Sequence, residues 1–376
     1  MVRGAPENAE GLKVALLTPA FWPEVRRGTE RMVHEVAAGL SACGHAPRVI
    51  TSHPGRPGRG EEDGIEVVRV WRPPQGRLVR RQYEDYTTHV PFSYAALRAG
   101  TYDIAHAWFV TDAAAAARWR ERTGRPAVHS YMGIPHHAGL MWKRGRLRYT
   151  LNALAGTDVT VALSRHAANE FRRWLGYDAP VIEPPVDIDT FKPGPPRTDE
   201  PTVICAAVAN EDRKRVWLLV RAWPLVRRER PTARLLLNQP RNPAEANAVT
   251  DLRSGIEVVN MDDRAELARL YSSAWVSALP SIHEAFGLVL AEAMACGTPG
   301  VGSDCDGIPE VIDSPAVGRL FEPDNERELA RAILEAFELA EDPATAQACR
   351  ARAERLSRAS RAEAYERLYK DLLAER

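Results

Sequence analysis

The sequence lacks a net charge, because 50 Lys and Arg residues balance 50 Asp and Glu residues. A general electrostatic attraction to nucleic acid is therefore not indicated, and nucleic acid is not an expected partner. Cysteine is scarce, and none of the five cysteines forms a Cys-x-x-Cys pair. Neither a zinc site nor a disulfide framework is expected, and a reducing compartment fits this composition.

Long apolar stretches and one common glycine motif are also absent. No run of about 18 apolar residues exists, so no membrane-spanning helix is expected. Residues 1–11 lack the apolar core of a signal peptide. The Gly-x-Gly-x-x-Gly fingerprint of dinucleotide-binding proteins is missing, which counts against a nicotinamide-dependent enzyme. The expected location is the cytoplasm, with peripheral contact at the inner face of a membrane left open.

Short apolar runs alternate with helix-like segments along the chain. This alternation predicts parallel sheets with helices on both faces, an α/β fold. The segment 54–64 is rich in Gly, Pro and Arg and is predicted to be a loop. The strand-like runs are residues 13–18, 48–52, 66–71, 103–108, 127–131, 159–163, 181–182, 203–208, 233–237, 256–259, 275–279 and 299–303.

The strand–helix series is interrupted once, by a proline-rich segment at residues 192–201. We therefore predict two doubly wound, Rossmann-like domains, 1–190 and 200–355, facing each other across a cleft. Residues 356–376 are predicted to form a helix that packs back toward the first domain. Ligands of such sheets bind beyond the carboxyl ends of the strands, so the cleft is the first place to seek a site.

The stretch HEAFGLVLAEAMACGTPGV, residues 283–301, places two glutamates in an apolar setting. Burying Glu292 in this helix-like run is costly unless the carboxylate has a partner. Gly287 lies near the expected helix start, where unpaired backbone N–H groups suit a phosphate. Carboxylates accept hydrogen bonds from sugar hydroxyls. The alternative is that Glu284 is a solvated charge and Glu292 a salt-bridged helix residue.

A basic segment follows the first strand of the second domain. Arg213 and Lys214 in NEDRKRVWLLVRA could neutralise a departing diphosphate. A solvated basic helix start is the simpler alternative.

Residues 280–312, PSIHEAFGLVLAEAMACGTPGVGSDCDGIPEVI, closely resemble the signature of the retaining glycosyltransferases of family 4. Residues 159–171 and 184–194 resemble further segments of the family in the expected order. The resemblance covers nearly the whole chain and implies the GT-B fold, a nucleotide-diphosphate sugar as co-substrate and no cofactor. It implies a donor-sugar contact for Glu284 and a ribose contact for Glu292. The residues matching its phosphate-binding backbone and helix start are Ala285, Phe286, Gly287 and Leu288.

The basic and glycine positions of the family match only in part. Lys214 matches the family's lysine, whereas Ala209 stands where the family has an arginine, so Arg213 is a candidate substitute. Gly28 is one of two glycines that the family usually has beside the donor phosphate. Arg27 replaces the other and adds bulk as well as charge.

The largest departure is in PAVHSYMGIPHH, residues 126–137. The family often has a histidine that hydrogen-bonds an outer hydroxyl of the donor sugar, and Met132 stands there. Methionine is apolar and cannot make that hydrogen bond. Either the donor lacks that hydroxyl, as in a 6-deoxy or pentose sugar, or His129, His136 or His137 acts from nearby.

Two further features concern the acceptor. The family often has a histidine near the acceptor where this chain has His106, which could equally be structural. Residues 142–149, WKRGRLRY, could contact a phosphorylated lipid acceptor or an anionic membrane, or form a solvated helix face. The acceptor-side candidates are His106, His129 and His136.

The sequence thus predicts a metal-independent hexosyl- or deoxyhexosyl-transferase that acts with retention on a hydroxyl acceptor: a small molecule, a lipid or a saccharide. No Asp-x-Asp motif stands in the expected context, and the nearest acidic pair is Asp262-Asp263. The alternatives are a non-catalytic nucleotide-sugar-binding protein and a phosphorylase or epimerase of the same fold. The base, the sugar and the oligomeric state are left open.

Overall fold

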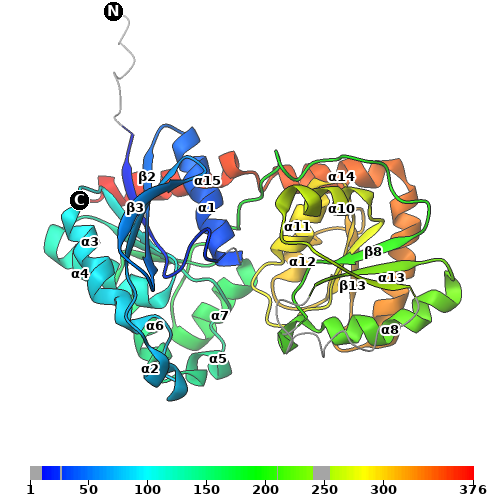
Figure 1. The fold of residues 1–376 in the computed structure, drawn as a ribbon, viewed down its shortest axis with the longest axis horizontal. Coiled ribbons are helices and arrows are strands. Elements are labelled where there is room, and N and C mark those ends of the chain that lie inside the picture. Colours follow the sequence, from blue (N-terminus) through cyan, green and yellow to red (C-terminus); the bar gives the residue numbers. More distant parts are fainter. Residues whose placement is uncertain (1–10, 26–27, 210, 240–254) are drawn as a thin grey trace, which may run out of the picture. The chain divides into compact units, whose positions relative to one another are not determined.

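The computed structural model describes residues 11–25, 28–209, 211–239 and 255–376. The chain forms two compact α/β units (Figure 1). Unit 1 contains the described residues up to 163, together with 168–185 and 358–376. Unit 2 contains residues 164–167 and the described residues of 186–357. No helix in the described part of the chain is both long and apolar enough to span a membrane.

Unit 1 is built on a seven-stranded sheet with the order β3-β4-β2-β1-β5-β6-β7. Every neighbouring pair is parallel except β3 and β4. The fully buried residues of β1, β5 and β6 form its centre. Its strands are β1 (Lys13–Leu17), β2 (Ala46–His53), β3 (Gly58–Glu62), β4 (Ile65–Trp71), β5 (Ile104–Ala107), β6 (Ala127–Ser130) and β7 (Val159–Val161).

Helices follow the strands of unit 1, as the sequence alternation predicts. The helices are α1 (Gly28–Ala42), α2 (Gly76–Arg80), η1 (Thr87–His89), α3 (Val90–Ala99), α4 (Val110–Thr123), α5 (His137–Trp142), α6 (Arg146–Gly156), α7 (Arg165–Leu175) and α15 (Arg358–Ala374). The first three residues of α7 belong to unit 2 and the rest of the helix to unit 1.

The prediction of a loop at residues 54–64 is wrong for its second half. Residues 58–62 form β3, which pairs antiparallel with β4. The connection is the dipeptide Asp63-Gly64, and both residues have positive φ values, 48° and 79°. An Asp-Gly pair with this backbone is the usual tight turn of a hairpin. The turn signal was present in the sequence, but Gly and charged residues hid the strand.

The C-terminal helix α15 is an integral part of unit 1. Tyr365 and Tyr369 are completely buried, and Arg358 forms an ion pair with Glu35 of α1. A Cβ on Gly39 of α1 would lie 2.9 Å from the Cβ of Ala362, so glycine permits the close approach of the two helices.

Unit 2 is built on a six-stranded, fully parallel sheet with the order β10-β9-β8-β11-β12-β13. A Cβ on Gly318 of β13 would lie 2.1 Å from the carbonyl oxygen of Gly300 in β12, so only glycine fits at this strand pair. The strands are β8 (Thr202–Cys205), β9 (Arg234–Asn238), β10 (Ile256–Val259), β11 (Val276–Leu279), β12 (Gly300–Ser303) and β13 (Gly318–Phe321).

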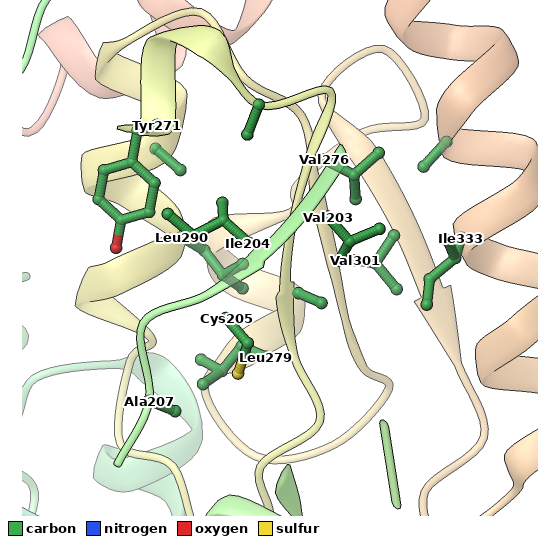
Figure 2. Packing of buried hydrophobic residues seen from close by; sticks show 14 of the residues in the cluster. Val203, Ile204, Cys205, Ala207, Tyr271, Val276, Leu279, Leu290, Val301 and Ile333 are labelled. Carbon is green, nitrogen blue, oxygen red and sulfur yellow. The ribbon is translucent and has the colours of Figure 1, made fainter. Parts of the chain in front are cut away.

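The core of unit 2 packs helices against this sheet. Val203 and Ile204 of β8, Val276 of β11 and Leu290 of α11 are buried together (Figure 2). The largely apolar segment 216–226 lies within α8. The helices are η2 (Asp212–Lys214), α8 (Val216–Glu229), α10 (Arg264–Ser273), α11 (Leu288–Ala295), α12 (Ile308–Val311), α13 (Glu326–Glu341) and α14 (Pro343–Glu354).

The two parallel α/β sheets confirm the predicted fold class. In unit 2 the strand order reverses between β8 and β11, and in unit 1 it reverses between β1 and β5. At such a reversal the two following loops diverge and leave a crevice at the carboxyl ends of the strands, where ligands of these sheets bind. The loops after β8 and β11 are therefore the first place to look in unit 2.

Candidate functional site

The candidate donor site of unit 2 is built from the loops that follow β8 and β11. The two strands are parallel neighbours, with Val276 paired to Val203 and Ser277 to Ile204. Their carboxyl ends therefore lie at the same sheet edge. The backbone N–H of Ile282 donates to the carbonyl oxygen of Arg213 at 2.8 Å and ties the two loops together.

The two loops contribute opposite charges that meet in one cluster. The ammonium nitrogen of Lys214 lies 2.5 Å from Oε2 of Glu284, and Nη1 of Arg213 lies 3.3 Å from the same oxygen. Burial alone would raise the pKa of the Glu284 carboxyl, but Lys214 and Arg213 outweigh burial and hold the pKa below its ordinary value. The carboxylate is therefore ionised at neutral pH and can accept hydrogen bonds from hydroxyl groups.

Arg213, the candidate substitute for the arginine that the family has at position 209, lies beside Lys214 in this cluster. Its second guanidinium nitrogen, Nη2, lies 2.7 Å from Glu211, so the side chain is held at the cluster from both sides. Ala209 is half-buried against the unit 2 core. The positive charge thus enters from η2 rather than from position 209.

Gly287 sets the start of α11 directly after the loop that carries Glu284. Its φ is +103°, a left-handed conformation that L side chains rarely adopt. The helix begins at Leu288 without a side-chain cap, and the first N–H groups of any helix lack an intrahelical acceptor. Ala285 and Phe286 are buried, so their side chains anchor the loop that leads into the helix. Such a helix start can hold a phosphate.

A second loop, which sequence reasoning did not select, supports the first. A Cβ on Gly307 would lie 2.2 Å from the carbonyl oxygen of Ala285, so any other residue would push the two loops apart. The Gly307 N–H donates to the Glu284 carbonyl at 2.9 Å. The His283 N–H donates to Oδ2 of Asp306 at 2.6 Å. The signal was available, because Asp306 and Gly307 lie within residues 280–312, the stretch that resembles the family signature.

Glu292 lies on α11, one helical turn beyond Leu288. Residues four apart share one face of a helix, about 6 Å apart along its axis. The Glu292 side chain is buried, as expected from its apolar neighbours. The structure thus places Glu284, the start of α11 and Glu292 on one continuous segment of unit 2.

Three candidates of unit 1 lie at or near helix starts. Gly28 is exposed at the beginning of α1, and nothing lies within 4 Å of an added Cβ. The neighbouring Arg27 lies outside the described residues. Met132 is half-buried in the segment after β6. His136 caps α5, where its Nδ1 accepts the Gly139 N–H at 3.2 Å.

The histidines His106 and His129 lie in the core of unit 1, and neither is exposed. His106 Nδ1 lies 2.7 Å from the hydroxyl of Tyr369, and Nε2 lies 2.9 Å from Oγ of Ser130. Burial lowers the pKa of His106 well below its ordinary value, with a smaller contribution from His129. Both ring nitrogens of His106 are thus occupied by side chains of unit 1. This geometry favours a structural role over the acceptor contact that the sequence suggested.

The acidic pair at 262–263 has a structural task. The Asp263 carboxylate accepts the backbone N–H of Glu266 at 2.8 Å and caps α10. In the ranges that the structure describes, no cluster of three or more His, Cys, Asp or Glu side chains could hold a metal ion.

Two protein-family models match successive parts of the sequence. "Glycosyltransferase Family 4" matches residues 26–190, and "Glycosyl transferases group 1" matches residues 200–338. The second match contains every candidate residue of the unit 2 site. The first contains those of unit 1.

Named proteins and solved structures are similar to this chain over most of its length. A D-inositol 3-phosphate glycosyltransferase of Xylanimonas cellulosilytica is 29% identical over 346 residues, which are 81% of this chain and 78% of that protein. Sucrose-phosphate synthase of Thermosynechococcus elongatus has a TM-score of 0.83 at 23% identity, covering 97% of this chain and 100% of that one. HepE of Anabaena, solved with UDP and glucose, has a TM-score of 0.75 at 20% identity, with 96% and 99% covered. The two structures share the fold.

The buried His129 predicts a specific pH dependence of stability. Burial lowers its pKa from 6.5 to about 3, so between those values the unfolded chain binds more protons than the folded chain. Stability therefore falls as the pH falls below about 6.5, by about 1.4 kcal/mol per pH unit for this imidazole. Urea unfolding of the wild type and of His129→Gln between about pH 7 and about pH 5 should show a shallower slope for the variant.

The matched control is His137→Gln, which removes an exposed imidazole from the same segment. It should leave the slope unchanged. The depressed pKa of Glu284 acts in a separate window, because its stabilisation is lost only as the pH falls below the ordinary carboxyl value. Parallel stability curves for the wild type and His129→Gln would contradict the burial of a neutral His129.

Proposed function

The chain belongs to the family 4 glycosyltransferases, which transfer a sugar from a nucleotide-sugar donor, and from this premise we propose that unit 2 binds the donor at the β8–β11 loops. In this proposal Glu284 binds the sugar, the start of α11 binds the diphosphate, and Glu292 binds the ribose. The observation that carries it is the Lys214–Glu284 contact of 2.5 Å at the sheet edge where a ligand of this fold is expected.

The cations Lys214 and Arg213 and the carboxylate of Glu284 fit the two sides of the bond that joins the diphosphate to the sugar. The anomeric carbon–oxygen bond breaks, and its electron pair leaves on the diphosphate. Lys214 and Arg213 stabilise that developing negative charge, which is stronger in the transition state than in the bound donor. Glu284 accepts hydroxyl hydrogen bonds from the sugar, whose ring becomes positively charged. Its own charge is held in place by the same two cations.

The acceptor hydroxyl attacks the anomeric carbon, forms the new bond and passes its proton to the leaving phosphate. No side-chain base is required by this route, which the family resemblance implies together with retention of configuration. It is therefore compatible with methionine at position 132 and with the buried His106 and His129. A cationic cluster beside the diphosphate also reduces the need for a metal ion, so we expect metal-independent transfer.

The donor sugar and the acceptor are the finer parts of the proposal. Met132 stands where the family resemblance implies a hydrogen bond to an outer sugar hydroxyl, so an apolar side chain there favours a 6-deoxy or pentose sugar. The named relatives act, by name, on D-inositol 3-phosphate. A phosphorylated polyol is therefore the first acceptor to test. The cytoplasmic location stays a prediction.

Two rivals differ in what they do with the donor. A non-catalytic binding protein is motivated by Met132 and Ala209, which depart from the family pattern at two charged or polar positions. A phosphorylase or epimerase would use the same fold and release a sugar 1-phosphate or an epimer. The charges of Lys214, Arg213 and Glu284 fit cleavage of the bond between sugar and diphosphate, and the match to the glycosyltransferase families favours transfer as the outcome of that cleavage.

Turnover by the purified protein tests the proposed activity. We expect a glycosylated product when nucleotide sugars, with and without a free 6-hydroxyl, are incubated with inositol phosphate and other hydroxyl acceptors. Product formation should persist after treatment with EDTA. Mass spectrometry distinguishes the product from a sugar 1-phosphate or an epimer. Binding without turnover would favour the non-catalytic rival, and preference for a donor with a free 6-hydroxyl would contradict the role given to Met132.

The two glutamates should separate nucleotide binding from use of the sugar. Glu292→Gln should weaken binding of the free nucleoside diphosphate about ten-fold or more, because a ribose hydrogen bond to a charged group is lost. Glu284→Gln should bind the nucleoside diphosphate within a few-fold of the wild type and lower kcat about a hundred-fold. Calorimetric titration and steady-state kinetics measure the two effects.

The control should change a glutamate of unit 2 whose carboxylate does not hold the backbone. Glu310 fails this condition, because its carboxylate accepts two backbone N–H groups. Glu338→Gln on α13 is preferable, since it makes the same change outside the proposed site. It should alter neither binding nor kcat. If both glutamate variants lower only the melting temperature, the carboxylates are structural and the proposed division between them is wrong.

A further inference from the structure

One end of unit 1 carries large apolar side chains that face solvent. Helix α2 and the segment 82–85 join the end of α5 there, since the Arg144 N–H donates to the Gln82 carbonyl at 2.7 Å and the Glu84 N–H to the Arg144 carbonyl at 3.0 Å. Figure 1 shows α2, α5 and α6 together at this end. We call the surface formed by residues 77–83 and 141–148 the α2–α5 surface.

The apolar part of the α2–α5 surface is unusually exposed. Trp142 is 68% exposed and Met141 58%, at the very end of α5. Val79 of α2 is 46% exposed, and Tyr83, which follows this helix, is 39% exposed. Single exposed apolar residues need no explanation, but a group contributed by two adjoining segments usually marks an interaction site.

The charges on the α2–α5 surface that have no ion-pair partner among the described residues are all positive. The two acidic side chains beside it are neutralised: Glu84 is buried and bound by Arg146 through two hydrogen bonds of 2.7 and 2.9 Å, and Asp85 is paired with Lys143. The remaining arginines are exposed, and no ion pair reaches them from any part of the chain that the structure describes. They are Arg77, Arg80, Arg81, Arg144 and Arg148.

The arginines lie beside the apolar side chains rather than apart from them. The guanidinium carbon of Arg144 stands 5.9 Å from the ring centre of Tyr83, and the Lys143 and Arg146 cations flank the Trp142 ring at 6.0 and 5.9 Å. Arg77 and Arg80 lie on the short helix α2 with Val79, and Arg81 is its C-cap. An anionic bilayer supplies negative charge for the exposed arginines and an apolar layer for the exposed apolar side chains beside them, so it is the occupant that this surface fits.

We propose that the α2–α5 surface docks unit 1 peripherally on an anionic lipid membrane. Trp142, Met141, Val79 and Tyr83 enter the boundary between headgroups and acyl chains, where aromatic rings with a polar edge are favoured. The uncompensated arginines bind lipid phosphates and release counterions. The inference goes beyond the proposed function, because it depends neither on the donor nor on the identity of the acceptor.

Sedimentation with vesicles tests this proposal on the full chain. The wild type should bind vesicles of phosphatidylcholine with phosphatidylglycerol, and bind vesicles of phosphatidylcholine alone about ten-fold or more weakly. Added salt should weaken binding to the anionic vesicles. The triple variant Arg77→Ser, Arg80→Ser, Arg81→Ser and the double variant Met141→Ser, Trp142→Ser should each lower the affinity about ten-fold or more.

Matched controls on unit 1 remove the same residue types elsewhere. The variant Arg98→Ser, Arg118→Ser, Arg122→Ser changes the net charge equally on α3 and α4, and Trp71→Ser removes a tryptophan that is 41% exposed. Both should bind vesicles like the wild type.

Circular dichroism and melting should show that all variants are folded, and transfer to a soluble acceptor should be unchanged in both surface variants. Failure of the wild type to bind anionic vesicles, or equal losses in the controls and the surface variants, would overturn the proposal. Failure of transfer itself would instead count against the proposed function.

Discussion

The parallel pairing of β8 with β11 is the constraint on which the candidate site depends. It brings the loops after two strands, some seventy residues apart in sequence, to one edge of the sheet, so that Lys214 and Glu284 meet at 2.5 Å with a sequence separation of 70. Both side chains are only 15% exposed. Taking two charges out of water is costly, and a buried ion pair is often no more stabilising than apolar residues of the same size. A pair kept under that cost at the carboxyl ends of the strands, where ligands of this fold bind, is better explained by a ligand than by stability.

Glycine fixes the course of the loops that follow β11 and β12. Gly287 turns the chain into α11 with a φ of +103°. Gly307 lets the loop after β12 touch the Glu284 loop so closely that a Cβ would lie 2.2 Å from the Ala285 carbonyl. These contacts act on the backbone, so they determine where the N–H groups at the start of α11 point. The same contacts therefore position both the Glu284 loop and the start of α11, the two parts of unit 2 to which the proposed function assigns the sugar and the diphosphate.

Much of this organisation could be predicted from the sequence, because strand–helix alternation and the stretch at residues 280–312 are local patterns. The pairing of Arg213 and Lys214 with Glu284 could not, since it depends on which strands become neighbours. The hairpin at β3 was missed because its Asp-Gly turn lies among charged residues, where a strand shows no alternation. The histidines were ambiguous for another reason: burial of His106 depends on Tyr369 in α15, 263 residues away. Local sequence carries no trace of such a contact.

The most direct test of the central claim is a double-mutant cycle between Lys214 and Glu284, measured on kcat/KM. If the two side chains act as one charge-matched unit on the donor, Lys214→Met and Glu284→Gln should be strongly non-additive, with a coupling free energy of about 1 kcal/mol or more. The double variant should then be little worse than the poorer single variant. Effects that add within about 0.3 kcal/mol would contradict the account, because they would mean that the two groups do not share a ligand or a task.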